Sequence, residues 1–146
     1  MNSTTRRVFA TLPLALALLL PASTVTASTI VAAPTLNARW ALLADDGTSV
    51  VLVGQYTCGP YPSGVPERGV IDLSLNQILG GAEVRGIGFL EPRVCDGQPQ
   101  WYAAELTVSA GGAFQRGRAR WSASGYIEGP SGVEPVSVPP TAIRVQ

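Results

Sequence analysis

The stretch that decides the fold is TLNARWALLADDGTSVVLVGQYTC, residues 35–58. Two apolar runs, 35–43 and 49–58, flank Asp45-Asp46-Gly47, and an Asp-Gly pair between such runs is typical of a hairpin turn. In the second run, alternate residues from Val50 to Cys58 share one face, and both faces are partly apolar. This stretch predicts an antiparallel hairpin whose second strand is central in its sheet.

Short apolar runs separated by glycine and proline continue to the end of the chain. We expect further strands at 70–77, 82–90, 101–108, 114–127 and 141–145, and loops at 59–66 and 128–134. Gly86 and Gly88 indicate a bulge or a close approach of another backbone. The pattern predicts an all-β fold: an immunoglobulin-like antiparallel β-sandwich of about seven strands over residues 35–146, with a closed barrel as the second possibility.

The start of the chain has the organisation of a signal peptide. Arg6 and Arg7 precede an apolar run at 8–20, and Val25 and Ala27 fit the −3 and −1 positions of a cleavage site. The run is too short for an ordinary membrane span. We expect a signal peptide at 1–27, a flexible leader at 28–34 and a secreted, extracellular domain, while the arginine pair leaves both the general secretory and the twin-arginine route open.

Composition restricts the partners. The chain has 146 residues, enough for one domain, and contains ten arginines, ten acids, no lysine and no histidine. Without residues 1–27, eight arginines stand against ten acids, a net charge of −2. Such a chain has no overall field that attracts polyanions, so we expect neither nucleic acid nor, after signal cleavage, a membrane as partner.

Cys58 and Cys95 are the only cysteines, and both lie in the exported part. In an oxidising compartment an even pair predicts a disulfide, and closing this loop stabilises the fold by about 4 kcal/mol. We expect the bond to join the two sheets of the sandwich near one end; two buried free thiols are the alternative.

Three short strings resemble a group of secreted actinobacterial domains of unknown function. They are GQYTC at 54–58, CDG at 95–97 with Trp101 beyond it, and FQRGRA at 114–119. The resemblance implies a two-cysteine immunoglobulin-like sandwich and an extracellular location, but no activity. The chain is more distantly similar to neocarzinostatin-type chromoproteins, which carry two disulfides where this chain can form one, so no site residue is transferred.

The residue types exclude most catalytic machinery. Without histidine or lysine the chain cannot build a Ser-His-Asp triad, a histidine-ligated zinc site or a Schiff base, so we predict a non-enzymatic protein without cofactor or metal. Carboxylate chemistry remains as the alternative, with Asp72, Glu83 and Glu105 as candidates for a secreted hydrolase. The pair Asp45-Asp46 is typical of a hairpin turn more than of a calcium site.

The candidate ligand-binding residues are aromatic and basic. Tyr61 lies in the proline-rich loop, and Trp101 is the outward member of its pair with Tyr102. Arg116, Arg118 and Arg120 form a basic stripe, which either grips a polyanion or pairs with acids on neighbouring strands.

We therefore predict a secreted binding or interaction domain of unknown ligand, with a protein, a cell-wall polymer or a small molecule as the partner. An exported protease inhibitor that presents residues 60–64 is a further alternative.

Overall fold

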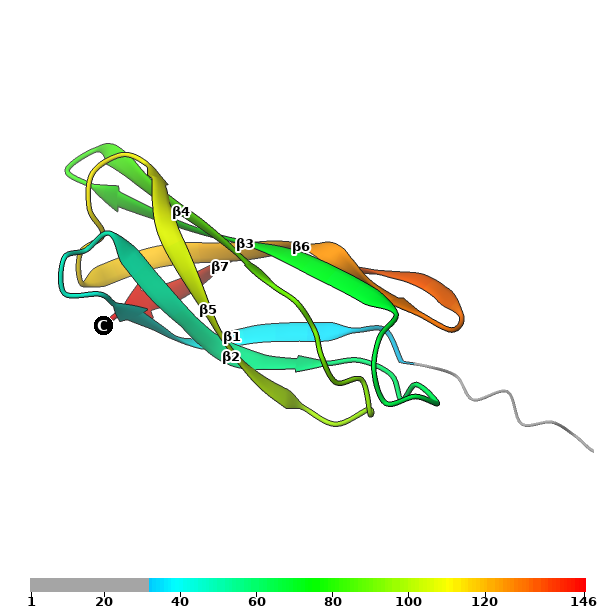
Figure 1. The fold of residues 1–146 in the computed structure, drawn as a ribbon. Coiled ribbons are helices and arrows are strands. Elements are labelled where there is room, and N and C mark those ends of the chain that lie inside the picture. Colours follow the sequence, from blue (N-terminus) through cyan, green and yellow to red (C-terminus); the bar gives the residue numbers. More distant parts are fainter. Residues whose placement is uncertain (1–31) are drawn as a thin grey trace, which may run out of the picture.

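A computed structural model of the chain describes residues 32–146, which form seven β-strands (Figure 1). The strands are β1 (Thr35–Leu43), β2 (Ser49–Thr57), β3 (Arg68–Leu79), β4 (Ala82–Leu90), β5 (Gln100–Ala110), β6 (Gly117–Gly129) and β7 (Gly132–Val145). Among these residues there is no helix long and apolar enough to cross a membrane. The predicted signal peptide and most of the leader lie outside the described residues, and residues 32–34 have no regular structure.

The strands form one closed barrel in the order β1-β2-β5-β4-β3-β6-β7. All neighbours are antiparallel except β1 and β7, which run parallel and close the barrel. The Leu43 N–H donates to the Gln146 carbonyl at 3.0 Å, and the Gln146 N–H donates to the Ala41 carbonyl at 2.9 Å. The predicted all-β fold of about seven strands is confirmed. The predicted immunoglobulin-like sandwich is wrong, because the ladder returns to its first strand instead of forming two stacked sheets.

Alternation along the strands fills the barrel interior. Ile71, Leu73 and Leu75 on β3 are buried as predicted, while Asp72 between them is exposed. Large side chains from several strands meet in one core. Those that are completely buried include Leu52, Ile71, Leu75, Leu106, Phe114 and Ile127. Most polar residues of β3 to β7 lie on the outer surface, whereas Gln77 of β3 is buried and bonds to the backbone of Gln115 at 2.7 and 2.9 Å.

The two glycines of β4 mark close contacts, as predicted. The register shifts between Arg85 and Gly86, and a Cβ at Gly86 would lie 2.8 Å from the ring of Phe114. A Cβ at Gly88 would overlap the carbonyl oxygen of Glu105 on β5. Glycine is therefore required at both positions by the space available, because any side chain would push β4 away from its neighbours.

The first predicted hairpin is confirmed, but the end of the chain differs from the prediction. The segment 128–134, expected to be a loop, is a tight turn in a long hairpin, because β6 runs to Gly129 and β7 starts at Gly132. The tip of this hairpin and the C-terminus lie at opposite ends of the molecule (Figure 1). The barrel accommodates Pro139-Pro140 inside β7 at a register shift, where the ladder is already interrupted.

Cys58 and Cys95 are bonded to each other, with their Cα atoms 4.7 Å apart. The bond joins the segment after β2 to the segment between β4 and β5, at one end of the barrel. The predicted pairing is thus confirmed, but the prediction that it joins two sheets is wrong, since all strands belong to one sheet. Backbone hydrogen bonds support the junction: the Tyr61 N–H donates to the Cys95 carbonyl at 2.8 Å, and the Cys95 N–H to the Gly64 carbonyl at 2.8 Å.

Candidate functional site

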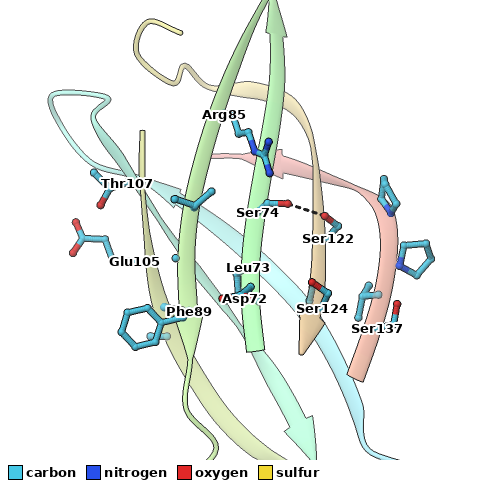
Figure 2. Close-up of a pocket in the computed structure, with 18 residues that line it drawn as sticks. Asp72, Leu73, Ser74, Arg85, Phe89, Glu105, Thr107, Ser122, Ser124 and Ser137 are labelled. Atoms are coloured by element: carbon cyan, nitrogen blue, oxygen red, sulfur yellow. Dashed lines mark hydrogen bonds between the residues drawn. The ribbon is translucent and has the colours of Figure 1, made fainter. Parts of the chain in front are cut away.

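A groove of about 1060 Å³ lies on the outer surface of β3, β4, β5, β6 and β7 (Figure 2). Small residues, namely Gly88, Ala103 and Ala123, form part of its lining. We call it the outer groove. Its polar lining side chains are Asp72, Ser74, Arg85, Glu105, Thr107, Ser122, Ser124 and Ser137.

Hydroxyl groups dominate one side of the outer groove. The Oγ atoms of Ser74 on β3 and Ser122 on β6 lie 2.7 Å apart and share a hydrogen bond (Figure 2). One step along the same strands, Ser124 stands opposite Asp72 on β3 and opposite Ser137 on β7. Each hydroxyl can donate one hydrogen bond and accept two, so this row can bind the hydroxyl groups of a ligand.

Both signs of charge are present in the outer groove. Arg85 extends from β4 toward Ser74, whereas Asp72 and Glu105 carry the negative charge (Figure 2). Within residues 32–146 the ion pairs are Arg68–Glu128 at 3.0 Å and Arg93–Glu91 at 2.9 Å. The charged groups of the groove are thus not neutralised by each other and can bind polar groups of a ligand.

Two large apolar side chains of β4 border the outer groove from the solvent side. Phe89 is 62% exposed and Ile87 is 51% exposed. The Phe89 side chain points away from β4 into solvent (Figure 2). An exposed aromatic ring next to hydrogen-bonding groups is a surface on which the apolar face of a ligand can pack.

Tyr61, predicted from sequence as a surface residue, is only 6% exposed. Its Oη atom donates to Glu134 Oε1 at 3.0 Å, and its ring packs against Gly129. Burial, the hydrogen bond to Glu134 and the charge of that residue together raise the pKa of Tyr61 to about 12. Tyr61 therefore anchors the loop after β2 to the β6–β7 hairpin and does not form part of an exposed surface.

Trp101 points outward as predicted and is 53% exposed, whereas Tyr102 is buried. Its ring stacks on Trp40 of β1 with the centroids 5.7 Å apart and the planes inclined by 10°. The guanidinium carbon of Arg39 lies 5.2 Å from the same ring. A register shift between Ala38 and Trp40 turns both Arg39 and Trp40 outward, which brings them to Trp101. This cluster does not line the outer groove.

Arg116, Arg118 and Arg120 are all exposed, and none forms an ion pair within 4 Å in the described part of the chain. The expectation that acids on neighbouring strands neutralise this stripe is therefore wrong. Arg118 and Arg120 line a second hollow together with Arg144 of β7, whereas Arg116 precedes β6 and lies outside it.

The predicted acidic candidates separate into two groups. Asp72 and Glu105 line the outer groove, and Glu83 does not. Asp46 is a turn residue, as the sequence indicates: it accepts hydrogen bonds from the backbone N–H and the hydroxyl of Thr48 at 2.9 and 2.8 Å. These bonds, the backbone one foremost, lower the pKa of Asp46. Over residues 32–146 no three metal-ligating side chains come together.

Four residues of these two hollows were not predicted from sequence: Phe89, Ile87, Arg85 and Arg144. A signal for the first three was present, because Gly86 and Gly88 occupy alternate positions of β4 and the intervening residues must face the other way. Arg144 could not be found from sequence alone. Its neighbour on β6 depends on the register of the last hairpin, and the local sequence pattern does not specify that register.

Comparison of the chain with protein-family models, with curated proteins and with solved structures finds no match. The proposals below therefore rest on the residues of this chain.

Proposed function

We propose that the chain is a secreted, non-enzymatic binding domain whose outer groove holds a sugar chain. The observation that carries this proposal is that one groove is lined both by the exposed ring of Phe89 and by the serine row of β3, β6 and β7. A pyranose has an apolar C–H face that packs on an aromatic ring and hydroxyl edges that bond to serine, aspartate and arginine. The groove is open and spans five strands, which fits a chain better than a small enclosed molecule.

The direct test is titration of the exported protein with a panel of neutral oligosaccharides, followed by Phe89→Ala. Burying a phenylalanine side chain contributes about 1.5–3 kcal/mol, so we expect the variant to bind about 10- to 100-fold more weakly. Val133→Ala is the matched control, because Val133 is equally exposed but lies near the tip of the β6–β7 hairpin, outside the groove. Equal binding by the wild type and by Phe89→Ala would refute the proposal.

A second candidate function is a carboxylate-dependent hydrolase, favoured by the presence of Asp72 and Glu105 in one groove. Two acids facing a common cleft are the minimum that glycoside hydrolysis needs. The distinguishing assay is release of reducing ends from a bound oligosaccharide. Release that disappears in both Asp72→Asn and Glu105→Gln, with binding retained, would replace the non-enzymatic proposal.

The protease-inhibitor alternative depends on the loop 60–64. Tyr61, the second residue of that loop, is buried against the β6–β7 hairpin and is not available to a protease pocket. A panel of secreted serine proteases tests what remains of this alternative, and lack of inhibition across the panel would remove it.

A further inference from the structure

Arg118 and Arg144 stand directly opposite each other on β6 and β7. Arg120 follows on the same face of β6, two residues along the strand, and all three side chains are exposed. Like charges at opposite positions of an antiparallel pair destabilise it. In the described part of the chain no acid lies within ion-pair distance of these arginines. Within residues 32–146 no ion pair compensates this repulsion, although the chain contains ten acids.

The three arginines border a hollow of about 800 Å³ between β3, β6 and β7, which we call the arginine hollow. No acidic side chain lines it; its other walls include Asn76, Ile78, Ala142 and Ile143. Apolar side chains thus form part of the wall beside the guanidinium groups.

Asn76 adds an independent observation. Asn76 lies on β3, opposite Arg120 of β6, and its Oδ1 atom is buried without a hydrogen-bond partner. A buried acceptor without a donor costs free energy, and rotation of the Asn76 amide toward a ligand hydroxyl in the hollow would remove that cost. The hollow thus has three cationic donors on its border and one lining residue, Asn76, with an unused acceptor.

We propose that the arginine hollow binds an oxyanion that stands next to a hydroxyl group, the chemistry of a uronate or of a phosphorylated polyol. The guanidinium fork of arginine matches the two oxygens of a carboxylate or phosphate, and Asn76 accepts from the neighbouring hydroxyl. This site adjoins the sugar site, since Pro140 lines both, but none of its three arginines lines the outer groove. The proposal for the arginine hollow holds whether or not a neutral sugar binds in the outer groove.

Nucleic acid is the less suitable polyanion. Proteins that bind single strands combine a longer basic track with aromatic rings on which bases stack, and no aromatic side chain lines the arginine hollow. The chain without residues 1–27 is also slightly acidic, so it provides no wider field for a nucleic-acid backbone.

The test is titration of the exported protein at low ionic strength with four probes of similar length. These are an oligogalacturonate, a glycerol phosphate oligomer, a neutral oligosaccharide and a single-stranded oligonucleotide. The variants are Arg118→Gln, Arg120→Gln and Arg144→Gln, with Arg116→Gln as the matched control from the same basic stripe. Thermal midpoints without ligand are measured in parallel.

We expect at least one of the first two probes to bind more tightly than the other two, with an affinity that falls as salt is added. Each hollow variant should weaken this binding about tenfold or more, since a charged hydrogen bond is lost, and Arg116→Gln should not. Without ligand, Arg144→Gln should keep or raise the thermal midpoint, because it removes the repulsion with Arg118. No binding of either anionic saccharide, tighter binding of the oligonucleotide, or equal affinity in all variants would overturn the proposal. Loss of neutral-sugar binding in Phe89→Ala alone concerns only the outer groove.

Discussion

Tyr61 donates a hydrogen bond from Oη to Glu134 Oε1 over 3.0 Å, which joins the loop after β2 to the start of β7. The other carboxylate oxygen, Glu134 Oε2, is buried without a partner. We expect Tyr61→Phe to lower the free energy of unfolding by about 1–3 kcal/mol, because it leaves both oxygens of the partly buried Glu134 carboxylate without a donor. Denaturant unfolding measures this. Tyr126→Phe, at a partly exposed position, is the control and should have little effect.

The raised pKa of Tyr61 makes stability depend on alkaline pH. Below pH 10 the phenol is protonated in both the folded and the unfolded chain, so its contribution is complete. Between pH 10 and about 12 the unfolded chain releases the proton while the folded chain retains it, so stability falls as pH rises. The free energy of unfolding, measured across this pH window, should fall less steeply in Tyr61→Phe than in the wild type. The variant should retain part of the decline, because burial also raises the pKa of Tyr102.

The disulfide between Cys58 and Cys95 spans 37 residues of sequence. Replacing both cysteines by alanine should lower the free energy of unfolding by about 4 kcal/mol, because the unfolded chain regains the freedom of that loop. Equilibrium unfolding of the double variant provides the comparison, and the wild type under reducing conditions should behave similarly. Unchanged stability in both would mean that the bond contributes nothing to the fold.

Gly88 keeps β4 and β5 in contact beside the outer groove. In Gly88→Ala the new Cβ would overlap the Glu105 carbonyl oxygen, so the backbone of β4 or β5 must move. We expect this movement to lower the free energy of unfolding by about 1–3 kcal/mol. Gly112→Ala is the matched control, since nothing lies within 4 Å of its Cβ. Similar stability of the two variants would show that the contact between the strands is looser than described.

Much of the strand pattern was predictable because it depends on local alternation and turn chemistry. Asp46-Gly47 identified the first hairpin, and the alternation of Ile71, Leu73 and Leu75 identified the core face of β3. Closure of the barrel was not predictable, since it depends on hydrogen bonds between Leu43 and Gln146 at distant points of the chain. An alternating strand has the same sequence signature in a sandwich and in a barrel.

The candidate site was less predictable than the fold. The outward position of Trp101 followed from alternation, but its stacking on Trp40 depends on a bulge that no local signal specifies. Tyr61 was expected on the surface because proline-rich loops are usually exposed, yet it packs under the last hairpin. The arginine hollow needs the β6–β7 register, which puts Arg144 opposite Arg118.

The central claim, that ligand binds along the outer groove, is tested most directly by amide chemical shifts. The ¹⁵N-labelled protein is titrated with the oligosaccharide that binds most tightly in the neutral panel. We expect the largest shifts at Ser74, Phe89 and Ser122, which line the groove on three neighbouring strands. Shifts concentrated instead around Trp40 and Trp101, on the part of the barrel formed by β1 and β5, would contradict it.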